Sequence, residues 1–234
     1  KDERFINSVK VTLIYVVTSV PTKLIFALFV AYLLTQGRRG VTFYRSLYYV
    51  PSLIGGSIAV ALVWKTIFSR KGLANTILAS LGLQKLSWLG DPKLSMGILV
   101  LMSAWQFGSS MIIFAAGLKE IPGSYYEAAE IDGANKWQRF LSITLPCLSP
   151  IILYNLVMQT ITAFMAFTQA FVITQGGPND ATNFYALYVY NHAFKWSNMG
   201  YASAMSWLML VLISVITLIL FKSSKFWVFS EADQ

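Results

Sequence analysis

The chain has 234 residues, of which 56% are hydrophobic, 15% are aromatic and only 12% are charged. Soluble domains carry about a quarter charged residues, so this composition excludes an ordinary soluble domain and predicts a membrane protein. The formal net charge of +8 favours anchoring to anionic lipid, and no basic and aromatic motif indicates a nucleic-acid partner.

The apolar residues are grouped into five runs, and each run is long enough to cross the roughly 30 Å hydrocarbon layer as a helix. In chain order the runs are 11–34, 46–68, 94–118, 149–173 and 200–221. They lack the alternating pattern of barrel strands, and backbone groups in lipid must pair internally. We therefore expect an all-α polytopic membrane protein that forms a single domain over residues 1–234.

Lys23 lies near the middle of the first run, two residues after Pro21. A lone cation at that depth costs about 2.5–3.5 kcal/mol on insertion scales unless it reaches water or a partner. We prefer the interpretation that the span is tilted or offset, so that Lys23 faces a polar interior or a companion subunit. The alternative is a counter-charge for an anionic cargo, such as a uronate-containing saccharide or glycerol phosphate.

Polar side chains recur inside the third and fourth runs, which contain no Asp, Glu, Lys or Arg. Polar residues inside lipid face the bundle interior, so these residues mark a candidate substrate path. In the fourth run, intervals of 4, 3, 4 and 3 place on one helix face Asn155, Gln159, Thr162, Ala166 and Gln169. The third run adds Ser103, Gln106 and Ser110. Such groups suit sugar hydroxyls; alternatively, they form hydrogen bonds that hold neighbouring helices together.

The connection between these two runs, residues 119–148, reads as two short helices joined by a turn. Ser124 and Glu127 have the spacing of an N-terminal capping box. Gly133 stands where a left-handed residue ends the first helix, and Asn135 is a candidate cap for the second. The pattern predicts a compact helical hairpin at the membrane surface.

The hairpin carries a motif of seven positions whose spacing relative to one another is fixed. They are Glu127, Ala128, Ala129, Gly133, Ile143, Leu145 and Pro146. This pattern resembles the EAA signature of permeases in binding-protein-dependent ABC importers. Further stretches resemble the maltose-type carbohydrate branch of that family, namely Asn7-Ser8, Pro51, Trp64, 72–75, 88–92 and 176–178.

The resemblance implies the transmembrane domain of a type I ABC importer in the bacterial cytoplasmic membrane. Its partners are then a second permease subunit in a heterodimer, an ATPase dimer that binds ATP, and an extracytoplasmic substrate-binding protein. In such importers the EAA loop docks into a cleft of the ATPase, so that closure of the ATPase dimer moves the transmembrane helices. Family members usually have one more helix before the first, so we expect six spans in the full-length protein.

The same resemblance orients the chain, which the distribution of basic residues does not. Counting basic residues on the two faces gives a tie under the positive-inside rule. One face carries Arg38, Arg39, Arg45, Lys119, Lys136, Arg139, Lys222 and Lys225; the other carries Lys1, Arg4, Lys10, Arg70, Lys71, Lys85, Lys93 and Lys195. A cytoplasmic EAA loop places Ala128 and Gln234 inside and Lys1 outside.

The motif residues also have a direct physical interpretation. Ala128 and Ala129 allow the helix to approach a partner surface closely. Glu127 offers a carboxylate either to a cation on the ATPase or to the capping box, and we favour the contact with the partner. In the fourth run, related maltose permeases place sugar contacts that include the position of Gln159, whereas Ala163 and Ala166 are nonpolar here.

Several other functions are disfavoured. No G-x-x-x-x-G-K-[ST] phosphate loop is present, so we expect no ATP hydrolysis by this chain, no catalytic residue and no cofactor. The lone His192, in an expected aromatic loop over 185–196, has no Cys or paired carboxylate at ligand spacing, which argues against a metal site. A secondary transporter should carry acidic residues in its spans, and a scaffold has no use for a coupling motif.

Overall fold

The structure is a computed structural model that describes residues 2–36 and 40–229, and every regular element within them is helical. The elements, with η for a π-helical turn, are α1 (Glu3–Thr35), α2 (Val41–Ile54), α3 (Ile58–Ile67), α4 (Leu73–Ser80), α5 (Pro92–Trp105), α6 (Gly108–Glu120), α7 (Gly123–Ile131), α8 (Lys136–Arg139), η1 (Phe140–Thr144), α9 (Leu145–Phe164), η2 (Ala170–Thr174), α10 (Tyr185–Tyr190), η3 (Asn191–Lys195) and α11 (Met199–Ser224). The expected all-α fold is confirmed.

Three helical stretches are long and apolar enough to cross a membrane on their own. They are Glu3–Thr35, Lys136–Phe164 and Met199–Ser224. Two bent pairs, α2 with α3 and α5 with α6, bring the number of candidate spans among the described residues to five if each pair is one span. This number agrees with the five spans predicted from the sequence, although the second and third are each a bent pair of helices rather than a single helix.

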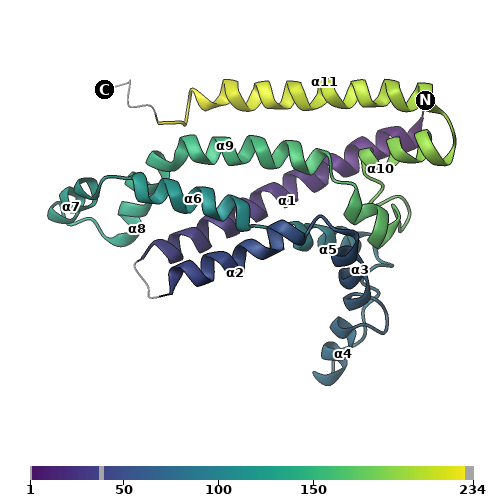
Figure 1. The fold of residues 1–234 in the computed structure, drawn as a ribbon, viewed down its shortest axis with the longest axis horizontal. Coiled ribbons are helices and arrows are strands. Elements are labelled where there is room, and N and C mark those ends of the chain that lie inside the picture. Colours follow the sequence, from purple (N-terminus) through teal and green to yellow (C-terminus); the bar gives the residue numbers. More distant parts are fainter. Residues whose placement is uncertain (1, 37–39, 230–234) are drawn as a thin grey trace.

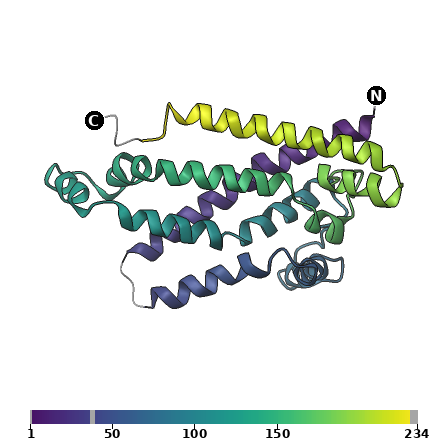
Figure 2. The same ribbon diagram turned by 45° about the horizontal axis from the view of Figure 1, so that its top comes forward.

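Helix α1 lies at the centre of the bundle and packs against α5, α6 and α9 (Figures 1 and 2). It begins at Glu3 rather than at residue 11, because the Asp2 side chain accepts a hydrogen bond from the Phe5 N–H and caps the first turn. Ala27 and Ala31 are fully buried, and such small side chains allow neighbouring helices to approach closely.

The second span breaks between α2 and α3, which meet at 98°. Pro51 removes one backbone donor from α2, and Ser57 caps α3 through a hydrogen bond from the Val60 N–H to its Oγ. Gly55 lies at the break, and a Cβ at this position would overlap the side chain of Gln106. The break is therefore packed directly against the third span.

The third span bends by 45° between α5 and α6. Asp91 caps the start of α5 by accepting hydrogen bonds from the N–H groups of Lys93 and Leu94. Gly108 opens α6, where a Cβ would overlap the backbone carbonyl of Tyr48 in α2. The second and third spans thus approach each other backbone to backbone at the level where both are broken.

The fourth span also differs from the expected helix over 149–173. Helix α9 starts earlier, at Leu145, and ends at Phe164, after which residues 165–169 lead into the π-helical turn η2. The chain from α8 through η1 into α9 is continuous, since Pro146 occupies the first turn of α9, where its missing N–H is tolerated.

The two ends of the bundle carry different structures (Figures 1 and 2). The α7–α8 hairpin lies at the end where α11 finishes, and the start of α1 lies at the opposite end with α4 and α10. This arrangement agrees with the expected placement of residue 128 opposite the N-terminal end of α1. Lys1, Arg38, Arg39 and Gln234, which entered the orientation argument, lie outside the described residues.

Two helical segments were not predicted. Helix α4 is followed by a loop that Asn75 holds, because its side chain donates to the Leu86 carbonyl and accepts from the Leu86 N–H and the Trp88 Nε1–H. The stretch expected as an aromatic loop over 185–196 forms α10 and η3 instead. Its aromatic residues pack on α1 and α11.

Candidate functional site

Three irregular points of the spans border one pocket of about 210 Å³. They are the break between α2 and α3, the bend between α5 and α6, and the segment that follows the end of α9 at Phe164. The pocket is lined by Tyr15, Val20, Lys23, Gly56, Ser103, Gln106, Gln159, Thr162, Ala163, Met165, Ala166, Phe167, Thr168 and Gln169. We call this the central pocket. Irregular backbone at membrane depth is tolerated only where protein buries it or where it lines an aqueous cavity, and here the breaks border a pocket.

Most of the predicted path residues lie together here. Lys23, Gln106, Gln159, Thr162 and Gln169 come from α1, the α5–α6 break, α9 and the segment that follows α9, and all five line the central pocket. Ala166 and Gln169 are not on the same helix as the other residues of the predicted stripe, because α9 ends at Phe164. The nonpolar lining residues Ala163 and Ala166 were also noted in the sequence.

Asn155 does not line the central pocket. Its side chain is buried in α9, where Nδ2 donates to the Ile151 carbonyl at 3.1 Å. Its Oδ1 is buried and has no hydrogen-bond partner among the described residues. Ser110 likewise lies outside the pocket and is fully buried, and its hydroxyl has no hydrogen-bond partner among the described residues, so neither a place on the path nor the predicted hydrogen bond between helices is seen for it.

Gln106 ties the second and third spans together at the pocket. The side-chain Nε2 of Gln106 donates to the Gly55 carbonyl at 3.3 Å, and the backbone carbonyl of Gln106 accepts from Ser52 Oγ at 3.0 Å. Ser52 Oγ also accepts from the Ser109 N–H at 3.1 Å. These bonds satisfy backbone groups that the breaks release, as a broken span in lipid requires.

Lys65 links α3 to η2, the π-helical turn that follows α9. Its Nζ donates to the Val172 carbonyl at 3.1 Å, where η2 nears its end. A cation beside the last carbonyls of a helical segment is electrostatically favourable. The lysine at the end of the second apolar run thus has a local structural partner.

A row of aromatic rings leads from the central pocket toward the end that carries α10. Phe167 lines the pocket and stacks on Phe171 with ring centroids 5.1 Å apart. Tyr190 contacts both rings, at 4.9 and 5.3 Å, and Phe194 lies 5.0 Å from Tyr190. The sequence did not single out this row, because its members lie on three elements that only the fold brings together.

The opposite end carries the hairpin of α7 and α8. Gly133 has φ +78°, and the Ala134 N–H donates to the Ala129 carbonyl while the Gly133 N–H donates to the Glu130 carbonyl. This is the Schellman pattern of a left-handed helix end, as predicted. Asn135 caps α8 in a reciprocal capping box with Gln138, which confirms the second predicted cap.

The predicted capping box at the start of α7 is wrong. The helix begins at Gly123, Pro122 occupies the cap position, and no side chain caps the turn. Ser124 therefore lies inside the helix. The structure therefore rules out the capping role that was considered for Glu127. The Glu127 side chain is exposed and forms no ion pair with any residue of the described ranges.

The hairpin is joined firmly to the helices that enter the membrane. Arg139 Nη1 lies 2.9 Å from Glu130 Oε2 across the two arms. The Tyr126 and Thr144 hydroxyls are 2.9 Å apart and link α7 to η1, and Tyr32 of α1 packs edge-on against Phe140 at 5.2 Å. Ile143, Leu145 and Pro146 are all half-buried in the turn from η1 to α9.

The outer surface of α7 has no partner within the described chain. None of its residues is buried, and Ile131 is 88% exposed. Ala128 is exposed and Ala129 half-buried, so the helix presents a small-residue face flanked by apolar side chains.

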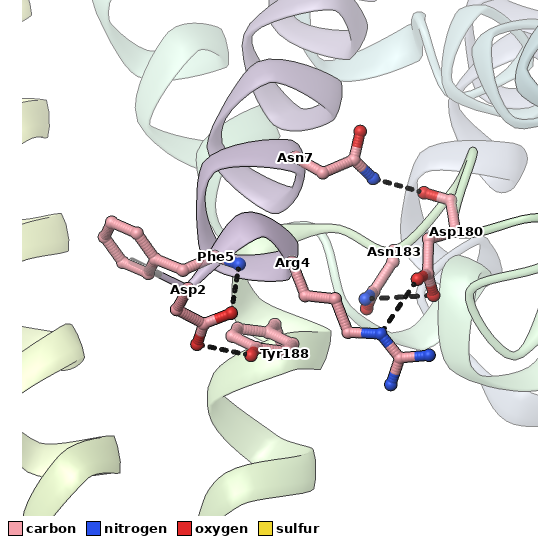
Figure 3. Close-up of polar contacts among 7 residues, drawn as sticks. All are labelled: Asp2, Arg4, Phe5, Asn7, Asp180, Asn183 and Tyr188. Carbon is pink, nitrogen blue, oxygen red and sulfur yellow. Dashed lines mark hydrogen bonds and ion pairs between the residues drawn. The ribbon is translucent and has the colours of Figure 1, made fainter.

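Near the start of α1, polar contacts join that helix to the loop between η2 and α10 (Figure 3). Arg4 Nε lies 3.3 Å from Asp180 Oδ2, and Asn7 Nδ2 donates to the Asp180 carbonyl at 3.1 Å. Asp180 adopts a left-handed backbone conformation with φ +56°. We call these contacts, with Asp2 and Tyr188, the N-terminal clasp.

Asp2 accepts three hydrogen bonds in the N-terminal clasp. The Tyr188 and Tyr201 hydroxyls lie 2.8 and 2.9 Å from Oδ2, and the Phe5 N–H lies 3.1 Å from Oδ1. Desolvation raises the pKa of Asp2, but these hydrogen bonds outweigh it, so the pKa lies below its usual value of 3.8. Burial and the bond to Asp2 raise the pKa of Tyr188.

His192 lies in η3 among aromatic rings rather than in a loop. Tyr188, Trp196 and Tyr201 surround its ring with centroid distances of 4.6, 4.6 and 4.7 Å. Within residues 2–36 and 40–229, no three His, Cys, Asp or Glu side chains gather in a way that could hold a metal ion.

The chain matches known membrane transport proteins over nearly its whole length. The family model described as "Binding-protein-dependent transport system inner membrane component" matches residues 3–226. The probable ABC transporter permease protein YesP of Bacillus subtilis is 53% identical over 236 residues, which cover 100% of this chain and 76% of the relative.

Two further relatives extend the comparison. The trehalose/maltose transport system permease protein MalF of Thermococcus litoralis is 34% identical over 224 residues, which cover 95% of this chain and 75% of the relative. The crystal structure of a bacterial ABC transporter involved in the import of the acidic polysaccharide alginate matches with a TM-score of 0.87 and 25% identity, over 96% of this chain and 80% of that one.

Family membership assigns the general role of the chain. Its counterparts are membrane components that depend on a separate binding protein, and they bind no ATP themselves. The chain belongs to the binding-protein-dependent transport system inner membrane component family and is a non-catalytic, multi-pass permease subunit of an ABC importer.

Proposed function

We propose that this permease carries sugars or oligosaccharides through the central pocket and is driven by an ATPase dimer that grips the α7–α8 hairpin. The observation that carries the proposal is the meeting of three broken spans at one pocket lined with amides, hydroxyls and a cation. The domain over 1–234, with its coupling loop over 119–148, acts as one unit in this account.

The cargo class is supported by the pocket and by the relatives. Gln159, Thr162 and Gln169 offer amide and hydroxyl groups that can replace water around sugar hydroxyls, and Phe167 offers an aromatic face. Pockets of this kind combine an apolar lining with a few polar groups that fix orientation. One relative is named for trehalose and maltose and another for alginate, and both cargoes are carbohydrates.

A companion permease is supported by the size of the central pocket. Its volume of about 210 Å³ is below the roughly 300–1,000 Å³ of pockets that enclose a ligand. A second, different permease subunit would then supply the rest of the wall and complete the passage. The exposed apolar residues on α2 and α3, such as Leu53, Ile58 and Leu62, suit contact with that subunit or with lipid.

Coupling through the hairpin is supported by its geometry. Glu127 and Ala128 are exposed at the bundle end, while Ile143, Leu145 and Pro146 lie where the hairpin turns into α9. Because α8, η1 and α9 are continuous, a force applied to α7 reaches the wall of the central pocket along one helix. Alanines at 128 and 129 let α7 fit closely into a cleft.

The aromatic row supports entry from the end that carries α10. Aromatic faces pack on the apolar faces of sugar rings, so Phe171, Tyr190 and Phe194 can hold a sugar between the surface and the central pocket. The same end carries the N-terminal clasp, and we place the docking of the extracytoplasmic binding protein there.

The direct test is to purify the complex from its host, identify the co-purifying subunits and reconstitute it in liposomes with its binding protein. Sugars of several classes are then assayed for stimulation of ATPase activity and for uptake. Stimulation by a saccharide, with a second permease and an ATPase in the complex, supports the proposal. Stimulation by amino acids, phosphate or metal chelates and by no saccharide contradicts it.

A further inference from the structure

Lys23 is the charged group at the centre of the passage. Its side chain is 9% exposed, and it lines the central pocket together with Gln106 and Gln159. It lies on α1, the helix that packs against most of the bundle. The remaining exposure of this residue therefore faces the pocket rather than open solvent.

No carboxylate of the described chain neutralises Lys23. The ion pairs found there join Arg4 to Asp180 and Arg139 to Glu130, and no Asp or Glu lines the central pocket. A buried cation without a partner is expensive, so such residues in membrane proteins mark substrate or ion pathways.

Comparison with Lys65 shows that Lys23 has no structural role of the same kind. Lys65 donates to the Val172 carbonyl at 3.1 Å and so stabilises the end of η2. No hydrogen bond or ion pair joins the Lys23 ammonium to any residue of the described ranges. Gln106, its neighbour in the pocket, is already committed through Nε2 to the Gly55 carbonyl.

We propose that the Lys23 ammonium binds the carboxylate of an acidic sugar in the central pocket, so that the cargo is an oligosaccharide with a uronate unit. This inference rests on the proposed function, because it takes the central pocket to be the sugar path. It adds a defined subsite, with Gln159 and Thr162 placed to bind hydroxyls of the same sugar.

The charge of the subsite selects a carboxylate over a phosphate. Lys23 is the only Lys or Arg among the residues that line the central pocket, so this chain contributes a single positive charge to the subsite. A uronate carries one negative charge, whereas a phosphate monoester carries about −1.5 to −2 at pH 7. Phosphate sites typically add an Arg fork or further donors, and the pocket holds no Arg.

The competing explanation is that an acidic residue of the companion permease pairs with Lys23. That arrangement would make Lys23 a structural residue, and its removal would then affect all cargoes alike. The two explanations therefore differ in how uptake depends on the carboxylate of the cargo.

The experiment uses the complete importer in proteoliposomes with its binding protein. The cargoes are a trigalacturonate and its carboxyl-reduced analogue, in which each carboxylate is replaced by a hydroxymethyl group. Both are supplied at concentrations that saturate the binding protein, which removes its own selectivity. The variants are Lys23→Met, Lys23→Arg and the matched control Lys10→Met, because Lys10 is exposed on the same helix and does not line the pocket.

We expect the wild type and Lys10→Met to take up the acidic cargo, and Lys23→Met to lose about tenfold or more of that uptake while handling the reduced cargo as the wild type does. Lys23→Arg should restore part of the loss. An equal loss for both cargoes in Lys23→Met, or equal uptake of both by the wild type, overturns the inference. Uptake of neutral sugars alone removes the uronate subsite but leaves the proposed function standing, whereas no response to any saccharide removes both.

Discussion

The hydroxyl groups of Tyr126 and Thr144 lie 2.9 Å apart and form the direct polar link between α7 and η1. Thr144 is 1% exposed, so its hydroxyl has little access to water. In the proposed coupling mechanism, this contact passes movement of α7 to the turn that leads into α9. The first prediction follows from this contact.

Tyr126→Phe removes the link while keeping the ring. The expected result is a folded complex whose uptake per ATP hydrolysed falls by a factor of about 2–30, as befits a loss of about 0.5–2 kcal/mol of coupling. Tyr32→Phe is the control, because the Tyr32 ring packs on the hairpin and keeps that contact. Unchanged coupling in Tyr126→Phe would show that α7 and η1 move together without this bond.

Gly133 permits the reversal between α7 and α8 because it adopts φ +78°. Gly133→Ala should cost about 1–2 kcal/mol in that conformation and shift α7 from its docking position. Uptake should fall while the amount of protein in the membrane, measured by immunoblot, stays near normal. Gly123→Ala is the matched control, since a Cβ there meets no atom within 4 Å. Equal activity of the two variants would contradict the role of Gly133.

Charge reversal at the exposed end of the hairpin is a more severe change. Glu127→Lys should abolish uptake without removing the protein from the membrane, because the carboxylate is exposed and, in our account, meets a cation on the ATPase. Glu130→Lys is the comparison, since Glu130 pairs with Arg139 within the hairpin. It tests the alternative that uptake depends on ion pairing inside the hairpin rather than on a contact with the ATPase. Substrate-dependent uptake by Glu127→Lys at the wild-type rate would count against the docking assignment.

Gln159 is the amide residue of α9 that lines the central pocket, where Thr162 of the same helix adds a hydroxyl. Gln159→Ala should raise the KM for uptake about 2- to 12-fold, the equivalent of one hydrogen bond of about 0.5–1.5 kcal/mol. Met158→Ala is the control, since Met158 is the preceding residue, is exposed and does not line the pocket. A rise in KM of the same size in both variants would indicate a general effect on α9.

The N-terminal clasp should weaken in acid. The pKa of Asp2 lies below 3.8 in the folded chain, so its contribution to stability is present above about pH 4 and is lost as the pH falls through the lowered pKa. The Tm of the purified complex should therefore fall less in Asp2→Asn than in the wild type between pH 5 and about pH 3. Parallel curves for the two proteins would show that Asp2 does not carry this dependence.

The amino-acid sequence predicted which residues meet but not how the spans bend. Gln106 and Gln159 were found because polar side chains are rare in apolar runs, and that signal does not depend on helix geometry. The breaks at Gly55 and after Phe164 depend on which neighbour each backbone approaches, and the periodicity of one run contains no such information. Asn155 lies on the same unbroken helix as Gln159 but outside the central pocket, because the pocket borders only the last turns of α9.

Predictions of helix ends were correct where the residues of a single turn determine the structure, and contacts between separate elements were missed. Gly133 and Asn135 were predicted correctly, because a left-handed residue and a side-chain cap act within a few residues. The cap at Ser124 failed because α7 starts two residues earlier than that cap requires, at Gly123 after Pro122. The aromatic row through Phe171 and Tyr190 was missed because its members come from separate elements.

Site-directed cross-linking at Ala128 tests the central claim most directly. In a background with Cys147→Ser, Ala128→Cys should cross-link to the ATPase subunit in inside-out vesicles and should resist a membrane-impermeant maleimide added to intact cells. Lys85→Cys, at the opposite end of the bundle, should react with that reagent from outside and should not cross-link to the ATPase. Labelling of Ala128→Cys from the outside, or uptake at the wild-type rate in a strain without the ATPase, would contradict the account.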